Sequence, residues 1–299
     1  MNKVLCVGDS CADVIIPYGL AKQHQSANAY FSCGGACANS AYGLAKLGCD
    51  VAFVGKAGDD LYGREMKEQL AEVGVNVDHF VLDSQMVSTQ VLCVIDEKGE
   101  RENFLMPAEN SSYLQIKKED LCDASLDGYK YVLTNGMMLF DQPCCESISA
   151  FLQRVKTGGT SIIVDINYRG EMAGKERKWF DLAMELADYV LGSDEDFTGL
   201  NLEVESLTKQ GKTVIVHNSK GADLISDKLK FHCDSYHVDV VDTLGAGDSF
   251  NSGFIYGLTN GMPLQDSVKA ALGYAAINVS SKGARNNCDR SKLEEFLRG

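Results

Sequence analysis

Short apolar runs alternate with amphipathic stretches along this chain, and that alternation restricts the fold more than any other feature. Runs of strand length, rich in β-branched residues, cover residues 3–7, 51–55, 131–133, 161–164, 189–191 and 213–216. Such continuously apolar strands are typical of a parallel sheet that is covered on both faces. Helical periodicity fills the intervals, as at residues 61–73, 144–155, 176–187 and 264–281. The pattern predicts an α/β, doubly wound, mostly parallel sheet flanked by helices, in a single domain over residues 1–299.

Two segments interrupt this rhythm. Residues 88–94 and 102–105 read as two strands joined through Asp96-Glu97-Lys98-Gly99, which is a hairpin signal. Residues 11–31 show little helical pattern. We expect the segments at about 11–31 and 88–105 to form a small β-sheet lid that stands apart from the main sheet. An antiparallel extension of the main sheet is the alternative from pattern alone.

The charge balance excludes several kinds of partner. The chain has 42 acidic and 28 basic side chains, a formal charge of −14. It would be repelled by phosphate backbones and anionic lipid headgroups, so we expect neither a nucleic-acid nor a membrane partner. No stretch approaches the ~20 apolar residues of a membrane span. The first ten residues become polar too soon for a signal peptide.

Cysteine usage indicates a reducing compartment. The eleven cysteines are an odd number without a regular framework, and we expect reduced thiols in a cytoplasmic protein. Small buried side chains are the favoured interpretation of most of them, ahead of metal binding.

The stretch at residues 240–250, Val-Val-Asp-Thr-Leu-Gly-Ala-Gly-Asp-Ser-Phe, is the richest candidate site. Its Gly-Ala-Gly run allows a tight turn from a strand into a helix. Unpaired backbone N–H groups at such a helix start, together with the helix dipole, favour an anion such as a transferring phosphate. Asp248 lies in the first turn, where it could take the proton of a substrate hydroxyl. The alternative is that Asp248 or Asp242 only caps a helix.

A second cluster begins with Gly34-Gly35-Ala36 and continues as a helical pattern to Gly48. Small residues at its head let a ligand or another backbone approach closely. Asn39, early in this helix, offers both a donor and an acceptor to a polyol. This is a second candidate for ligand contact.

Read together, these segments resemble the ribokinase-like (PfkB) family of carbohydrate kinases. Gly-Gly-Ala-x-Ala-Asn at 34–39 resembles the amino-terminal signature of the family, and Asp-Thr-x-Gly-Ala-Gly-Asp-Ser-Phe at 242–250 matches its carboxy-terminal signature. The two motifs lie about two hundred residues apart, so the resemblance covers essentially the whole chain. It implies a ribokinase-like fold and the ATP-dependent phosphorylation of a hydroxyl on a small sugar or sugar acid of the fructose, ribose or 2-keto-3-deoxygluconate type. ATP and Mg²⁺ are the implied cofactors.

The resemblance also implies roles for individual residues. Asp248 looks like the catalytic base, and the amides of Gly245, Ala246 and Gly247 look like the anion hole for the charge that grows during transfer. The sugar-binding residues of the family correspond to Asp13, Gly35 and Asn39. Asp13 has a turn role as its alternative. Arg169, in the Asp-x-Asn-x-Arg segment at 165–169, resembles an anchor for substrate or phosphate, with a surface ion pair as the alternative.

Three positions depart from the family pattern or extend it. Where the family has Asn-x-x-Glu, which organises magnesium, this chain has Ser193 in place of Asn and Asp196 in place of Glu. Glu195 is the alternative carboxylate for this role. Where the family has Thr-x-Gly before the nucleotide loop, this chain has Val-His-Asn at residues 216–218. The nucleotide-binding candidates are Asn218, Lys220 and Gly221. Asp242, six residues before the base, resembles a ligand for a monovalent cation, and a potassium requirement is a hypothesis on that ground.

Substrate class is the weakest inference. The two lid segments contain only Lys22, Lys98 and Arg101 as basic residues, so an unphosphorylated sugar is preferred to a phosphorylated one. A nucleoside kinase of the same family is an alternative, with a stacking surface drawn from Tyr18, Tyr30, Phe31 and Tyr113.

Other classes of protein remain as alternatives. A catalytically silent sugar or nucleotide sensor is one of them. A nicotinamide-dependent oxidoreductase is remote, because no Gly-x-Gly-x-x-Gly follows the first strand. By resemblance we expect a homodimer through the lid, since an exposed strand edge invites pairing.

Overall fold

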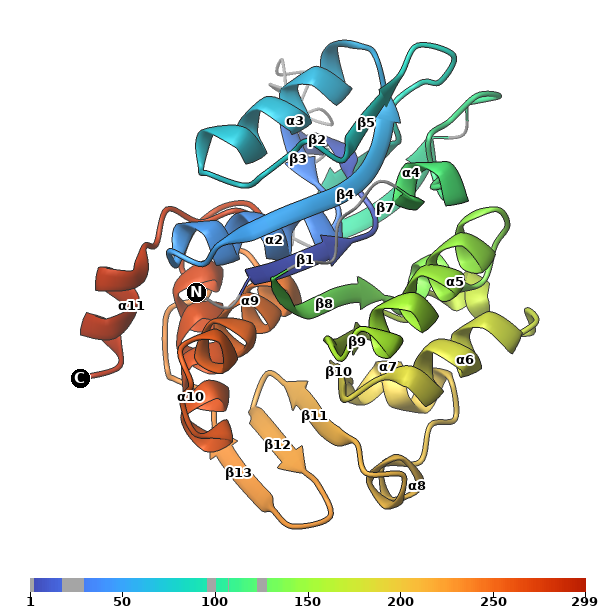
Figure 1. Cartoon of the computed structure of the whole chain (residues 1–299). Helices are drawn as coiled ribbons and strands as arrows, with labels where there is room; N and C mark the ends of the chain where they lie inside the picture. Colours follow the sequence, from blue (N-terminus) through green and yellow to red (C-terminus); the bar gives the residue numbers. More distant parts are fainter. Residues whose placement is uncertain (1–2, 18–29, 96–100, 107, 123–127) are drawn as a thin grey trace.

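A nine-stranded sheet forms the centre of the molecule (Figure 1). The structure is a computed structural model, and it describes residues 3–17, 30–95, 101–106, 108–122 and 128–299. The strand order in the sheet is β13-β12-β11-β10-β9-β8-β1-β4-β5. These strands are β1 (Lys3–Val7), β4 (Val51–Gly58), β5 (Phe80–Asp83), β8 (Tyr129–Asn135), β9 (Ser161–Asp165), β10 (Tyr189–Ser193), β11 (Thr213–Asn218), β12 (Gly221–Ile225) and β13 (Lys230–Asp234).

The run from β11 to β5 is parallel throughout, and only β12 and β13 pair antiparallel at one edge. The chain passes from β1 to β4 on one side, and later from β8 to β11 on the other. The strand order therefore reverses beside β1, which is where open α/β sheets collect ligands at the carboxyl ends of their strands.

Helices cover both faces of the sheet, and Figure 1 shows α5 and α6 on the opposite side from α2, α9 and α10. The helices are α2 (Ala36–Lys46), α3 (Leu61–Glu72), α4 (Lys118–Cys122), α5 (Cys144–Thr157), α6 (Lys178–Leu186), α7 (Asp194–Gly199), α8 (Val204–Lys209), α9 (Ala246–Thr259), α10 (Leu264–Val279) and α11 (Arg290–Phe296). Two short 3₁₀ turns, η1 (Gly136–Leu139) and η2 (Gly170–Met172), follow β8 and β9.

Each face of the sheet has its own apolar core. In β1, Val4 and Cys6 pack with the residues of α2 and α9, whereas Leu5 and Val7 pack with those of α5 and α6. Successive side chains of a strand point to opposite faces, so a strand buried on both sides must be apolar at every position. This explains why the runs at 3–7 and 161–164 show no alternation.

A four-stranded sheet stands apart from the main one, in the order β3-β2-β6-β7. It consists of β2 (Cys11–Pro17), β3 (Tyr30–Gly34), β6 (Gln90–Ile95) and β7 (Arg101–Met106). The predicted hairpin is confirmed, because β6 pairs antiparallel with β7. The small sheet expected from these segments is confirmed, and the alternative, in which they extend the main sheet, is excluded. The hairpin turn at 96–100 and residues 18–29, with Tyr18, Lys22 and Lys98, lie outside the described residues.

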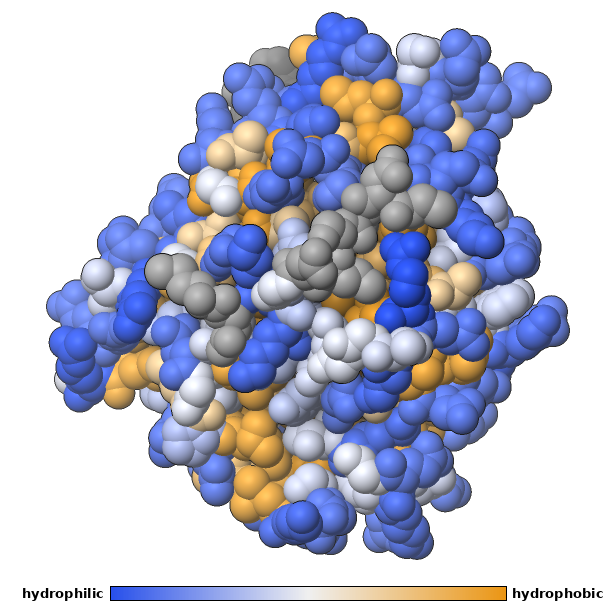
Figure 2. All heavy atoms as spheres, viewed as in Figure 1, coloured by the Kyte–Doolittle hydropathy of each residue, from blue (hydrophilic) through white to orange (hydrophobic). Residues whose placement is uncertain are grey.

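The α/β prediction is confirmed, and each of the six predicted strands is present. The first has the predicted bounds, β8 is longer by two residues at each end, and the others are longer by one to three residues at their carboxyl ends. The sequence analysis missed β5, β12 and β13. β5 and β13 are the edge strands of the sheet, and β12 lies next to β13. β13 is only partly buried, and neither β12 nor β13 has a continuous apolar run. Among the residues described, no helix is both long and apolar enough to cross a bilayer. Hydrophilic residues cover most of the face shown in Figure 2.

Candidate active site

The largest group of chemically active side chains lines a cavity of about 690 Å³. The cavity lies at the carboxyl ends of β1, β8, β9, β10 and β11, closed on one side by the start of α9 and on another by the small sheet. Its acidic lining residues are Asp9, Asp13, Asp165, Glu171, Glu195, Asp196 and Asp248. The arginine that lines it, among the described residues, is Arg169. The cavity therefore joins both sequence signatures.

The late glycine turn is shaped by backbone geometry. Gly245 has φ 72°, in the left-handed region, and a Cβ on it would lie 2.6 Å from the carbonyl oxygen of Ala284. Both constraints require glycine. The amide of Ala246, predicted to belong to the anion hole, instead donates to the carbonyl of Thr243 at 3.3 Å. The amides of Gly245 and Gly247 have no acceptor among the residues described. These two amides can serve an anion at the start of α9.

Buried side chains hold that turn in place. Asp242 accepts a hydrogen bond from the amide of Leu244 at 2.9 Å and another from the amide of Gly283 at 2.8 Å. The side-chain amide of Asn278 donates to the carbonyl of Leu244 at 2.7 Å. Asp242 therefore supports the turn directly, which is the structural alternative that its motif position left open.

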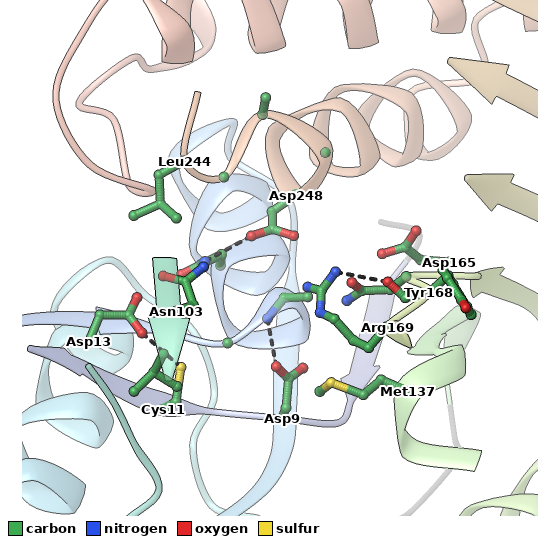
Figure 3. Close-up of a pocket in the computed structure, with 18 of the residues that line it drawn as sticks. Asp9, Cys11, Asp13, Asn103, Met137, Asp165, Tyr168, Arg169, Leu244 and Asp248 are labelled. Atoms are coloured by element: carbon green, nitrogen blue, oxygen red, sulfur yellow. Dashed lines mark hydrogen bonds between the residues drawn. The ribbon is translucent and has the colours of Figure 1, made fainter. Parts of the chain in front are cut away.

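Asp248 lies in the first turn of α9, half-buried and facing the cavity (Figure 3). The side-chain amide of Asn39 donates to its Oδ2 at 2.8 Å. Burial, helped by Asp9 and Asp13 and opposed by Asn39 and Arg169, raises the pKa of Asp248 to about 7. A carboxyl whose pKa lies near neutrality is suited to take and release a proton.

Sequence reasoning missed Asp9. It follows β1, and its carboxylate accepts hydrogen bonds from the amides of Ala36 and Cys37 at 2.9 and 3.1 Å and from the side-chain amide of Asn135 at 2.6 Å. Asp9 thus caps the N-terminus of α2 and ties it to the end of β8. The sequence signal that could have identified Asp9 as a site residue is its position in the Gly8-Asp9 pair, directly after the first strand.

Gly35 and Asp13 line the side of the cavity nearer the small sheet. Gly35 has φ 97°, and a Cβ on it would lie 2.6 Å from the Cα of Ser10, so the start of α2 can only approach the end of β1 with glycine there. Asp13, on β2, accepts a weak hydrogen bond from the thiol of Cys11 at 3.3 Å. Both residues line the cavity with Asn39, so the structure brings together the three predicted sugar-binding residues.

Arg169 reaches between Asp9 and Asp248 in Figure 3. Its Nη1 donates to the carbonyl of Tyr168 at 3.1 Å. No carboxylate among the described residues pairs with its guanidinium within salt-bridge distance, so the surface ion pair is not found there. Burial, together with Asp196 and Asp248, holds the pKa of Asp165 well above its usual range, and Arg169 opposes this shift.

The predicted magnesium residues, Glu195 and Asp196, lie at the start of α7. Asp196 Oδ2 accepts from the amide and hydroxyl of Ser193 at 2.6 and 2.8 Å, and Oδ1 accepts from the amide of Tyr168. Its oxygens are therefore largely used within the protein. Glu195 is exposed and lines the cavity. Among the described residues no three metal-ligating side chains converge. This donor set suits a cation that keeps most of its waters, as Mg²⁺ does.

The nucleotide-binding candidates Asn218, Lys220 and Gly221 form the turn between β11 and β12. Asn218 Oδ1 accepts from the amides of Lys220 and Gly221 at 2.8 and 3.2 Å, and its Nδ2 donates to Asp194 at 2.6 Å. None of the three lines the cavity, whereas His217, the residue before Asn218 on β11, does. Burial lowers the pKa of His217 to about 4, and its ring packs on Phe250 with centroids 4.4 Å apart.

Comparison with known proteins gives one family. A model described as pfkB family carbohydrate kinase matches residues 1–291. The 5-dehydro-2-deoxygluconokinase of Geobacillus kaustophilus (strain HTA426) is 26% identical over 281 residues, which cover 88% of this chain and 84% of the relative.

Solved structures agree with the fold. A fructokinase double mutant from Vibrio cholerae O395, in its fructose, ADP and potassium ion bound form, matches with a TM-score of 0.84 at 25% identity, over 99% of this chain and 98% of that one. The aminoimidazole riboside kinase from Salmonella enterica, complexed with aminoimidazole riboside and an ATP analog, also matches with a TM-score of 0.84, at 26% identity over 99% and 100% of the two chains.

Proposed function

The chain belongs to the pfkB family of carbohydrate kinases, and we propose that its cavity transfers the terminal phosphoryl group of ATP to a hydroxyl of an unphosphorylated sugar or sugar acid. The observation that carries this proposal is the pairing of Asp248 with Asn39 at 2.8 Å beside the glycine turn of α9. One motif supplies a base and the other supplies a hydroxyl-binding amide, and they meet in one cavity.

In the proposed reaction Asp248 accepts the proton of the attacking hydroxyl. The sugar oxygen forms a bond to the γ-phosphorus, the bond from that phosphorus to the β–γ bridging oxygen breaks, and ADP leaves with the electron pair. A carboxyl with a pKa of about 7 is partly ionised at neutral pH and can take the proton as the bond forms. The amides of Gly245 and Gly247 face the charge that develops on the phosphoryl oxygens.

Asn39 and Asp13 are the proposed contacts to the sugar hydroxyls. The Asn39 amide group keeps a second N–H beyond the one given to Asp248, and carboxylate oxygens accept from hydroxyl groups. Arg169 is the proposed anchor for the substrate or for phosphate. These roles come from the motifs and the shared cavity lining.

Magnesium is proposed to enter with the nucleotide. Glu195, and Asp196 through water, would hold it, and it would neutralise charge on the phosphate oxygens. Asn218, Lys220 and Gly221 are the proposed contacts to the nucleotide. A monovalent cation near Asp242 is a further proposal, which the potassium-bound fructokinase favours as an analogy.

The preference for an unphosphorylated acceptor rests on charge. Within the described lining there are seven carboxyl groups and one arginine. A phosphate already attached to the acceptor sugar would need a cluster of basic side chains to bind it. The side chains of Lys22, Lys98 and Arg101 fall outside the described residues and do not enter this argument.

The decisive experiment measures ADP release with ATP and Mg²⁺ against a panel of acceptors, with and without K⁺. The panel contains fructose, ribose, 2-keto-3-deoxygluconate, 5-dehydro-2-deoxygluconate and a riboside. Turnover with a sugar or sugar acid supports the proposal. Selective turnover of the riboside would favour the nucleoside kinase, and saturable binding without turnover would favour the silent sensor.

We also propose a homodimer through the small sheet. β3 and β7 are its edge strands, and Tyr30, Phe104 and Met106 on them are 46%, 50% and 42% exposed. Unpaired edges with apolar side chains favour pairing with a second copy. A monomeric mass by light scattering at assay concentration would reject the dimer. A cytoplasmic location is proposed from the ten described cysteines, all of which are free thiols.

A further inference from the structure

Arg285, in the loop between α10 and α11, lies directly behind Asn39. Its Nε donates to Asn39 Oδ1 at 3.0 Å and its Nη1 donates to Gln69 Oε1 at 3.1 Å. The guanidinium carbon lies 5.2 Å from the centroid of the Tyr42 ring. Arg285 does not line the cavity itself. No sequence motif pointed to it, because it follows the late signature by more than thirty residues.

We propose that Arg285 is a positioning residue for phosphoryl transfer: by holding Oδ1 of Asn39, it fixes the amide so that Nδ2 faces Asp248 and the acceptor hydroxyl. The inference rests on the proposed function of this cavity. It adds Arg285 to the pair of Asn39 and Asp248. In this proposal Arg285 controls how the base and the acceptor hydroxyl are oriented toward each other.

The chemistry of the amide group makes the arrangement directional. An amide nitrogen only donates, and its oxygen only accepts. In the observed orientation the oxygen meets the guanidinium and the nitrogen meets the carboxylate. Rotating the amide by half a turn would bring oxygen against carboxylate and N–H₂ against guanidinium. Two charge-assisted hydrogen bonds would then be replaced by two repulsive contacts.

The environment of Arg285 indicates that burying its side chain lowers the stability of the fold. Its Nη2 is closed off from solvent and has no hydrogen-bond partner among the described residues. Burial lowers the pKa of Arg285, while Cys33, Tyr42, Cys11 and Asp13 raise it. A buried donor without an acceptor destabilises a fold. A purely structural role would be better served by an apolar side chain of similar size.

Arg285 is itself held from a second helix. The side-chain amide of Gln69 donates to Glu65 at 3.0 Å, both on α3, which directs Gln69 Oε1 toward the guanidinium. The contacts therefore run from α3 through Arg285 to Asn39 on α2, and from there to Asp248 on α9.

Several charged groups surround the base, and one of them, Asp13, also interacts with Arg285. Asp248 faces Asp9 after β1, Asp13 on β2, Arg169 after β9, and Asp165 at the end of β9. Asn39 opposes the upward shift of the Asp248 pKa by donating a hydrogen bond. Weakening that donation should raise the pKa of Asp248, so that the base is protonated over a wider range of pH.

The test compares Arg285→Met with Arg290→Met. Arg290 is a matched control, because its Nε donates to Glu294 at 2.6 Å and its guanidinium carbon lies 5.8 Å from the Tyr256 ring, away from Asn39. For Arg285→Met we expect kcat/KM for the sugar to fall about tenfold, as when a hydrogen bond to a charged group is lost. KM for ATP should stay within about twofold, and the acid limb of the pH profile should move to higher pH. Arg290→Met should leave kcat/KM for the sugar, KM for ATP and the pH profile unchanged.

Two further variants separate positioning from loss of fold. Arg285→Lys keeps a donor that can reach Asn39 Oδ1, and it should recover part of the lost kcat/KM. The double variant Asn39→Ala with Arg285→Met should be no worse than Asn39→Ala alone, since the two act through one contact. Additive losses, or an Arg285→Met protein whose melting temperature falls while KM and the pH profile stay unchanged, would overturn the proposal.

A spectroscopic measurement tests the inference without turnover. The side-chain ¹⁵N–H₂ resonances of Asn39, assigned by their loss in Asn39→Ala, should follow the ionisation of Asp248 in the wild type. In Arg285→Met their titration should shift to higher pH; an unchanged titration contradicts the inference. Failure of every acceptor in the kinase assay would reject the proposed function while leaving this readout intact, so the two failures are distinguishable.

Discussion

At the α9 end of the cavity the polar side chains are held by buried neighbours, whereas at the end formed by β10 and β11 they bond to one another near the surface. Asp242 and Asn278, which fix the glycine turn, are 8% and 0% exposed. Glu195 and Asn218, the corresponding candidates at the other end, are both exposed. The cavity therefore joins a rigid region to a region that solvent reaches.

This difference indicates which part of the cavity already has its final geometry before ligands bind. Hydrogen bonds among buried groups cannot be exchanged for water without loss, so the turn and the base keep one geometry. Exposed contacts are readily replaced by water or by a ligand, and they contribute little by themselves. We therefore expect substitutions at the α9 end to have large effects and substitutions at the β10–β11 end to have small ones.

The largest effect is expected for Asp248→Asn. Because the base is lost while its shape is kept, kcat should fall by about 10³ or more with sugar binding retained. Measured kcat and a sugar titration check this. Near-normal turnover would exclude Asp248 as the base and would remove the contrast between the two ends.

The same variant tests the pKa of Asp248 through stability. The folded-state pKa of about 7 lies above the ordinary value of 3.8, so the native state binds this proton more tightly than the unfolded state. That stabilising contribution is complete below about pH 4 and is lost as pH rises through about 7. Asp248→Asn should therefore melt higher than the wild type at pH 8, with a smaller difference at pH 5. An equal difference at both pH values contradicts the shift.

The next effect is expected for Gly245→Ala. The substitution combines a left-handed φ of 72° with a Cβ placed 2.6 Å from the Ala284 carbonyl oxygen. We expect a loss of about 1–3 kcal/mol in stability, and kcat lower by about 10²-fold because an anion-hole amide is displaced. Gly48→Ala is the matched control, since Gly48 has φ 78° but nothing within 4 Å of a Cβ. If both variants lose the same activity, the close approach at Gly245 is not what matters.

Asn39→Ala should give an intermediate effect. Removal of one amide that serves both the sugar and the base should raise KM for the sugar about tenfold. KM for ATP should stay within about twofold, because Asn39 contacts Asp248 and Arg285 and none of the nucleotide candidates. Steady-state kinetics with each substrate varied in turn measure the split. A similar rise in both KM values would indicate a general loss of structure.

The smallest effects are expected at the β10–β11 end. Glu195→Gln should raise the Mg²⁺ concentration for half-maximal rate about threefold, and Asn218→Ala should raise KM for ATP by no more than about threefold, as suits exposed contacts. Glu205→Gln, an exposed carboxylate on α8 outside the cavity, is the control for general charge. A loss at Glu195 as large as that at Asp248 would show that this end is organised as firmly as the other.

Much of the fold could be predicted because its signals are local. A strand such as β9 has a continuous apolar centre, residues 162–164, and a helix such as α5 repeats its apolar residues with helical period. Each pattern therefore indicates which residues of the element are buried. β12 and the edge strand β13 were missed because polar residues interrupt their apolar pattern. The glycine turn was found since only glycine adopts its conformation freely, and that requirement is visible in the residue itself.

The sequence by itself determined the α/β class, the two motifs and the identity of the proposed base. Only the tertiary structure decided which residues meet: Asn39 contacts Asp248 across 209 residues, and Arg285 contacts Asn39 across 246. It also decided that Asp9 caps α2, and that Asn218 closes the turn between β11 and β12. The physical reason is that local patterns depend on neighbours along the chain, whereas these contacts depend on strand order and helix packing, which bring distant segments to one cavity.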